Sequence, residues 1–297
     1  MATISRGTRE ERYRFIRDHR ERFGTAWLCR WLNVSRSAYY QWLSPSESVR
    51  QLSDRQLVKH IAHVFEGSDG IYGSPRVHRE LRREGIRVGE KRVARLMQQY
   101  GMRGRCSRVY KPAPKGTREY YSKHPNRLLD AGKPTALNQQ WVGDVTYLKV
   151  GRKWFYLSTV MDRFSRRILS WKLSHERTAG ITCQVLKRAL KASGSDGSGI
   201  IFHTDRGSEY GAEAVQKLLG SKGMIASMNR PGKCTDNGAM ESFFHSLKAE
   251  KLTGNIWKTY SGLKSALKQY IDRFYNRTRL HSGLGYMSPL EYEAING

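Results

Sequence analysis

Acidic residues are scarce in this chain of 297 residues, which carries 26 Asp and Glu against 53 Lys and Arg and has a formal net charge of +27. So large a positive surplus favours a polyanionic partner, because neutralising phosphates releases counterions and drives binding. A ribosomal or merely well-solvated basic protein would carry the same surplus. The charge therefore indicates a partner and leaves the function open.

Cysteines and long apolar runs are also few. The four cysteines are far apart and form no C-x-x-C pair: Cys29, Cys106, Cys183 and Cys234. We therefore expect reduced cytosolic thiols rather than a disulfide framework or a zinc knuckle. No stretch approaches the roughly 18–20 apolar residues of a membrane span, and charged residues follow the N-terminus where a secretory signal would be apolar. We expect no membrane partner.

The first 48 residues form a predicted N-terminal helical segment. Apolar residues recur at helical spacing from about residue 10 to 43, with a short turn at 33–35. Ser35 is placed to cap a helix that follows this turn. The pattern fits a helix-turn-helix, and it fits a plain helical hairpin equally well.

Residues 49–110 form a second predicted unit, with helices expected over 52–65, 77–85 and 89–101. Pro75 suits the first position of the middle helix. Between residues 70 and 130 there are 16 Lys and Arg against 5 Asp and Glu, an excess of 11. Such a run is often only a solvated face, but here it lies on a helix-turn-helix pattern and continues into a basic arm. We expect these residues to contact DNA: Arg76, Arg79, Lys91, Arg92, Arg95, Arg103, Arg105 and Arg108.

A basic linker is predicted over 111–136, followed by a catalytic domain over 137–256 and a C-terminal helical tail over 257–297. In the catalytic domain the pattern changes to strands, expected at 141–150, 154–162, 168–173, 200–204 and 224–228. Helices are expected at 179–192, 212–222 and 238–252. Three hairpin-connected strands followed by alternating helices and strands predict an α/β fold, a ribonuclease-H-like mixed five-stranded sheet flanked by helices. All-α helix-turn-helix units precede it.

Three acids stand where a metal ligand would be useful. Asp144 lies inside the first strand, Asp205 ends the fourth, and Glu241 lies on the helix after the fifth. Two strands and a helix that each offer one carboxylate can enclose a pair of Mg²⁺ ions, which supports phosphodiester chemistry. Each acid also has an ordinary explanation: a surface-facing strand residue, a turn residue before glycine, and a solvated helix acid. Those explanations must also account for the order of the three acids along the chain, for the two strands and the helix that carry them, and for the 35 residues between Asp205 and Glu241.

The helix that carries Glu241 offers more than one acid. Glu241, His245 and Lys248 are spaced at i, i+4 and i+7 and so share one face. An adjoining apolar face would pack under the sheet. This helix could therefore aim a carboxylate at metal while His245 and Lys248 contact DNA.

Several spaced motifs resemble those of a known family. They are Asp144-Val-Thr-Tyr147, His203-Thr-Asp205-Arg-Gly-Ser-Glu-Tyr210 and the run from Asp236 through Glu241 to Lys248. These look like the three blocks of a DDE transposase with a retroviral-integrase-like core. The tail from Tyr275 to Pro289 is similar to the second-frame (OrfB) products of the IS-three group of bacterial insertion sequences. The match runs over nearly the whole chain.

The resemblance implies a Mg²⁺-dependent enzyme in the bacterial cytoplasm, associated with the nucleoid. Asp144, Asp205 and Glu241 would carry two Mg²⁺ ions, which Mn²⁺ could replace, and Lys248 would contact DNA near the reacting phosphate. The enzyme would nick double-stranded transposon ends and use the freed 3′-hydroxyl to attack a target phosphodiester. No tyrosine nucleophile is then needed, so we expect Tyr147, Tyr156 and Tyr210 to serve in core packing.

Partners follow from the same resemblance. Joining two ends needs more than one active site, so we expect a homo-oligomer on DNA. Family members are often fused to a first-frame (OrfA) part with a leucine zipper, and no sustained heptad repeat precedes residue 43. The chain is then either a second-frame product that needs an OrfA partner or a version that works without one. Two rival functions remain: a non-enzymatic or regulatory DNA-binding relative, and a nuclease without strand transfer.

Overall fold

The computed structural model describes residues 7–44, 47–105, 124–231 and 234–297. The chain divides into two compact units, Met1–His63 and Val64–Gly297. Within the described residues, no helix is both long enough and apolar enough to cross a bilayer.

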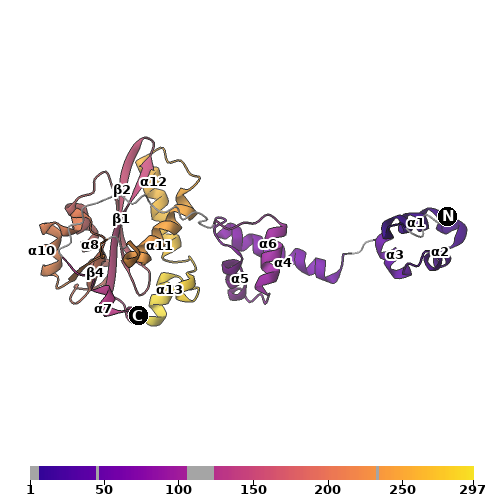
Figure 1. The fold of residues 1–297 in the computed structure, drawn as a ribbon, viewed down its shortest axis with the longest axis horizontal. Helices are drawn as coiled ribbons and strands as arrows, with labels where there is room; N and C mark the ends of the chain where they lie inside the picture. The colour runs from indigo at the N-terminus through magenta and orange to yellow at the C-terminus, as the bar shows by residue number, and fades with distance from the viewer. Residues whose placement is uncertain (1–6, 45–46, 106–123, 232–233) are drawn as a thin grey trace. The chain divides into compact units, whose positions relative to one another are not determined.

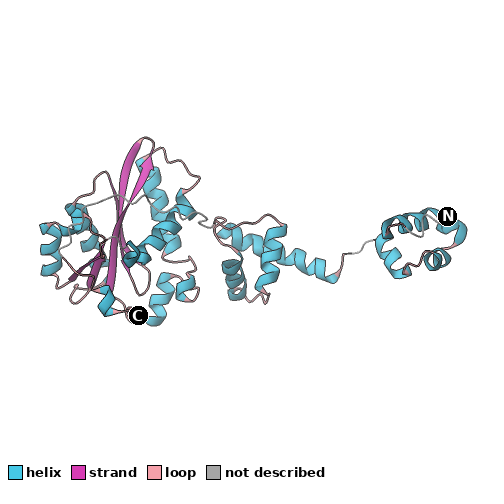
Figure 2. Cartoon of the chain, in the orientation of Figure 1, coloured by secondary structure: helices cyan, strands magenta, loops and turns pink. Residues whose placement is uncertain are grey.

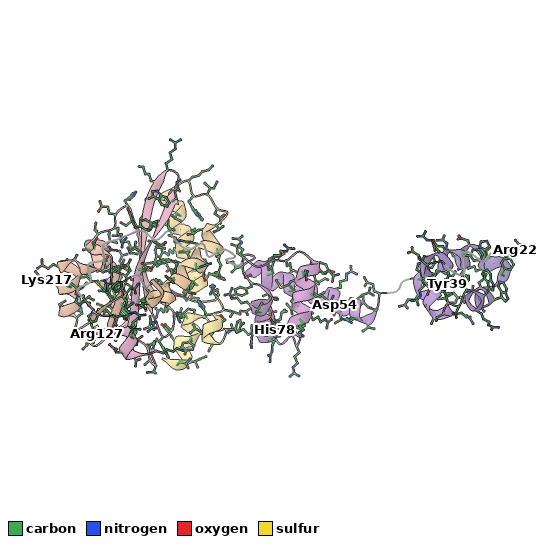
Figure 3. The ribbon with its side chains drawn as sticks, viewed as in Figure 1. Arg22, Tyr39, Asp54, His78, Arg127 and Lys217 are labelled. Carbon is green, nitrogen blue, oxygen red and sulfur yellow. The ribbon has the colours of Figure 1, made fainter. Side chains whose placement is uncertain are left out.

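The first unit is built from α1 (Arg9–Phe23), α2 (Thr25–Trp31), α3 (Arg36–Leu43) and the start of α4 (Val49–Gly67) (Figure 1). Its helical character confirms the sequence prediction, and Ser35 caps α3 by accepting from the Ala38 amide. Gly24, at φ +75°, separates α1 from α2, a break that the apolar spacing did not predict. Tyr39, labelled in Figure 3, is fully buried in the core of this unit.

The second unit continues from α4 through α5 (Ser74–Arg83) and α6 (Glu90–Gln99). Pro75 is the second residue of α5 rather than its first. The buried apolar residues of these two helices are Val77, Leu81, Val93, Leu96 and Met97. The remaining faces are rich in arginine and lysine, as the periodicity predicted.

A five-stranded mixed sheet forms the centre of this unit (Figure 2). Its strands are β1 (Gln140–Val150), β2 (Lys153–Asp162), β3 (Ile168–Ser174), β4 (Ile201–Thr204) and β5 (Ile225–Met228). Their order is β3-β2-β1-β4-β5. The first three pair antiparallel, whereas β4 pairs parallel to β1 and β5 parallel to β4. The five predicted strands are all present.

Helices cover both faces of the sheet because its strands carry apolar side chains on alternating sides. On one face α8 (Ala179–Ser193) and α10 (Glu213–Ser221) pack with Trp141, Val145 and Phe202. Lys217, labelled in Figure 3, projects from α10 away from the sheet. The short α9 (Ser208–Gly211) lies between β4 and α10 in the chain.

On the other face, α11 (Gly238–Leu247) and α12 (Tyr260–Lys268) pack with Val142 and Leu157. The sequence predicts one helix over 238–252, but the α-helix ends at Leu247 and Lys248–Leu252 is a π-helical turn. A second π-helical stretch, Gln269–Tyr275, extends α12, and α13 (Pro289–Asn296) ends the chain.

Part of the predicted linker packs on this sheet. The short α7 (Leu128–Ala131) places Leu128 in the core beside α11. The amide of Arg127 donates to the Ser227 hydroxyl of β5 at 2.9 Å. Residues 124–136 therefore belong to the packed structure of the second unit.

Candidate active site

Asp144 and Asp205 are brought side by side by the parallel pairing of β1 and β4. In that pairing Gly143 lies opposite Thr204, and the two acids are the next residue on each chain. Neighbouring strands lie about 4.8 Å apart. Gly143 permits the close approach, because a Cβ there would lie 2.7 Å from the Phe202 ring. Two segments separated by about 60 residues thus present adjacent carboxylates.

The electrostatics of Asp144 reflect this crowding. Burial, and then the negative charge of Asp205, raise the pKa of Asp144 from 3.8 to about 7. The backbone amide of Val145 donates to Asp144 Oδ1 at 2.7 Å and opposes the shift. A carboxyl group with so high a pKa lacks enough positive charge around it, and a bound cation would supply that charge.

Asp205 is held by a loop and by one arginine. The Gly207 amide donates to Asp205 Oδ1 at 2.9 Å, and Arg177 Nη2 lies 3.8 Å from Asp205 Oδ2. Arg177 also pairs with the buried Glu209 at 2.5 Å and donates to the Tyr147 hydroxyl at 3.1 Å. Arg177 therefore links the Asp205 loop to β1.

Glu241 lies on the exposed side of the first turn of α11. The residue before it, Met240, accepts from the Thr159 hydroxyl at 3.3 Å, and Thr159 pairs with Asp144 across β1 and β2. The helix is thus anchored next to Asp144. Even so, no three acids, histidines or cysteines among the described residues are grouped tightly enough to form a finished metal site.

His245 and Lys248 follow Glu241 along the chain. Lys248 is exposed and His245 is half-buried. Lys248 stands at the junction between α11 and the π-helical turn.

The predicted DNA-binding arginines fall into two groups. Arg76 and Arg79 of α5 contact the C-terminal segment: Arg76 Nε donates to the Leu280 carbonyl at 2.9 Å, and Arg79 lies 4.7 Å from the centre of the Tyr286 ring. Arg105 donates to the Glu250 carbonyl at 3.1 Å. These three therefore help to join α5 and the basic arm to the catalytic domain.

The second group faces outward. Lys91, Arg95 and Arg103 are exposed and Arg92 is half-buried. Arg108 lies outside the described residues.

Sequence reasoning missed Arg177 and Glu209, whose pairing across 32 residues leaves no local signal. It also assigned three tyrosines to the core. Tyr210 is buried in the core between the sheet and helices α8 and α10, and Tyr156 packs against that core. That assignment is wrong for Tyr147, which is 41% exposed and accepts a hydrogen bond from Arg177.

Comparisons with known proteins agree with this architecture. Two models described as an integrase core domain match residues 134–234 and 222–289, and an HTH-like domain model matches residues 51–110. The chain is 34% identical over 292 residues to the transposase InsF for insertion sequence IS3A of Escherichia coli (strain K12), covering 96% of this chain and 99% of that protein. The chain belongs to the IS3 family of transposases.

This transposase is similar to other proteins as well. It is 35% identical over 265 residues to an uncharacterized 31 kDa protein of insertion element IS600 from Shigella sonnei, covering 89% of this chain and 97% of that protein. Among solved structures, the catalytic domain of Mos1 mariner transposase shares 16% identity with a TM-score of 0.37, covering 46% of this chain and 71% of that chain. The integrase core match confirms the ribonuclease-H-like fold and an enzyme class that cleaves DNA and transfers strands.

Proposed function

We propose that the transposase cleaves the ends of its element and joins the freed 3′-hydroxyl to target DNA at a site built from Asp144, Asp205 and Glu241. The observation that carries this proposal is the adjacency of Asp144 and Asp205 where the parallel pairing of β1 and β4 ends, with α11 anchored beside them. Their carboxylates are hard oxygen donors of the kind that Mg²⁺ and Mn²⁺ prefer.

The donor set fits a divalent cation. Burial, and then the negative charge of Asp205, raise the pKa of Asp144, and among the described residues Arg177 is the cation within ion-pair distance of Asp205. Two Mg²⁺ ions bound there would activate the attacking hydroxyl and neutralise charge on the leaving oxygen. Arg177 would hold the Asp205 loop in position, and α11 would supply Glu241.

Contacts with DNA extend this proposal. Lys248 would contact a phosphate near the reacting bond, and His245 lies within one turn of it. Lys91, Arg92, Arg95 and Arg103 would track the phosphate backbone from the HTH-like domain. A homo-oligomer on paired ends and an OrfA partner belong to the same proposal, and the domain boundaries at residues 48 and 110 stay predictions.

Asp205→Asn tests the catalytic assignment. The substitution removes one ligand charge and keeps the side-chain size, so Mg²⁺-dependent nicking and joining of the cognate ends should fall by about 10³-fold or more. Binding of the ends, measured by gel shift, should stay nearly intact. Asp130→Asn makes the same change at an exposed site on α7 and should leave both steps unchanged.

Joining at the wild-type rate by Asp205→Asn would overturn the assignment. The assay should score nicking and joining separately in the wild-type protein. Nicking without joining would identify a nuclease, and the absence of both from protein that binds ends would identify a regulatory relative.

A further inference from the structure

A cavity of about 530 Å³ lies beside α11, on another side of the helix from Glu241. Ala239, Ser242 and Ser246 line it at helical spacing, whereas Phe243 and Leu247 point into the core. Its volume falls in the ~300–1,000 Å³ range of small-molecule sites. The fold, the family match and the acid site do not account for it.

Four arginines line this cavity: Arg76, Arg163, Arg166 and Arg279. Arg76 and Arg279 share one carboxylate, Glu250, at 3.8 Å and 2.5 Å. Among the described residues, the Arg163 guanidinium donates to uncharged oxygens alone, the Gly132 carbonyl and the Gln140 side chain.

The remaining charges leave the cavity positive. Arg166 has no carboxylate within ion-pair distance anywhere in the described ranges. Asp236 also lines the cavity, but its carboxylate is paired with Arg230 at 2.8 Å. The excess of guanidinium groups suits an anion.

The turn that carries Arg163 and Arg166 is held in a defined conformation by Asp162. Arg166 adopts φ +62°, a left-handed conformation that L residues rarely take. Asp162, 1% exposed, fixes this turn by accepting from the backbone amides of Phe164, Ser165 and Asn138 at 2.8–3.1 Å. A buried carboxylate thus holds an unfavourable backbone that puts Arg166 on the cavity wall.

Asn237 lines the cavity and has an unsatisfied hydrogen-bond acceptor. It is 4% exposed and lines the cavity, and its Oδ1 is buried without a hydrogen-bond partner. Its Nδ2 donates to the Gly143 carbonyl at 3.2 Å. An unpaired buried acceptor needs an N–H or O–H donor, which a fully ionised anion does not offer.

The start of α11 also borders the cavity. Gly238 and Ala239 line it, directly after the 3₁₀ turn Cys234–Asn237. A ligand that fits this cavity therefore carries two groups, an anionic group and a nearby N–H donor. A nucleotide carries both, a phosphate and a nucleobase.

We propose that this arginine-lined cavity binds one unpaired nucleotide of the DNA on which the transposase acts. Arg163 and Arg166 hold its phosphate, and Asn237 Oδ1 accepts from an N–H of its base. Asn237 also holds the Gly143 carbonyl, next to Asp144, so the bound nucleotide fixes the strand with respect to the acid site.

The test compares two fluorescent DNA probes on the full-length protein. One is a blunt duplex, and the other is the same duplex with a three-nucleotide unpaired tail carrying 2-aminopurine. Wild-type protein should bind the tailed probe at least about fivefold more tightly, and the 2-aminopurine fluorescence should change on binding. Arg166→Gly, which keeps the left-handed backbone and removes the guanidinium, should abolish the tail-dependent gain and leave blunt-duplex affinity within about twofold.

Arg188→Ala is the matched control, because it removes one exposed arginine from α8 on the other face of the sheet. It should keep the full tail-dependent gain.

The proposal is overturned if wild-type protein shows no preference for the tailed probe, or if Arg166→Gly retains that preference. If Arg166→Gly weakened the binding of both probes equally, Arg166 would be a general phosphate contact, and the proposal would again be overturned. Tighter binding of free dAMP than of the tailed probe would show a free nucleotide as the ligand and contradict the DNA assignment. Catalysis by the three acids is not involved in any of these outcomes.

Discussion

The two sides of α11 carry opposite charge. On one side Asp144 and Asp205 stand together, Arg177 lies within ion-pair distance of Asp205, and Glu241 lies in the first turn of the helix. On the other side four arginines line a cavity, and two of them share the buried carboxylate of Glu250. Asn237 joins the two sides through its hydrogen bond to the Gly143 carbonyl.

This difference shows how so basic a protein could keep the cation site proposed at these acids. A net charge of +27 would weaken cation binding if the charge were spread evenly. The acids are instead grouped where the parallel pairing of β1 and β4 ends, on another side of α11 from the arginine-lined cavity. Each side lacks the charge that its proposed ligand brings, metal on one side and phosphate on the other.

The largest effect on stability is expected from removing Arg279, which lies on the arginine-lined side of α11. Arg279 pairs with Glu250 at 2.5 Å, and both side chains are about 5% exposed. Arg279→Ala leaves a buried carboxylate without its main partner, which should lower the free energy of unfolding by about 3–5 kcal/mol. Urea denaturation measures this loss.

A second substitution shows whether the loss comes from the unpaired charge. Glu250→Gln in the Arg279→Ala background should recover part of the stability, because the buried group is then neutral. An Arg279→Ala protein within about 1 kcal/mol of wild type would show that the pair does not hold this side together.

A smaller effect, on the pH dependence of stability, sharpens the comparison. His281 lines the arginine cavity, where burial and then Arg279 lower its pKa from 6.5 to about 3, with Arg76 and Arg166 acting in the same direction. The native histidine stays neutral while the unfolded one takes up a proton below pH 6.5. Stability present above pH 6.5 is therefore lost as the pH falls towards 3.

Replacing His281 should remove part of this acid sensitivity. His281→Gln should lose less stability than wild type between pH 7 and pH 4, measured by the urea midpoint at each pH. His63→Gln, at an exposed position on α4, should keep the wild-type slope. Parallel slopes for wild type and His281→Gln would mean that the cavity does not disfavour a proton.

Much of the fold could be predicted because its signals are local. The alternation in β1 and β2 sorts Trp141 and Val145 to one face and Val142 and Leu157 to the other, and a sequence pattern records that period directly. The break at Gly24 was missed because the apolar spacing runs on across it, and only the positive φ of the glycine ends α1.

The site was predictable in part, for the same reason. Asp144 lies inside a strand-like run and Asp205 follows one, so their positions could be read from the chain. Arg177 could not, because it lies before α8 and its role depends on Glu209 and Asp205 far along the sequence. Arg76 looked like a DNA-facing helix residue, yet tertiary packing turned it toward Leu280.

The arginine cavity had no sequence signal at all. Its walls come from α5, β1, the turn after β2, the start of α11 and the segment around the end of the second π-helical stretch. A pattern in one segment cannot report a surface that five distant segments share.

Anomalous diffraction from crystals grown with Mn²⁺ tests the central claim most directly, because it locates the metal without an activity assay. The account predicts a Mn²⁺ peak within about 2.5 Å of carboxylate oxygens of both Asp144 and Asp205, lost in Asp205→Asn. Saturating Mn²⁺ with no peak between these two acids, or with a peak that persists in Asp205→Asn, would contradict it.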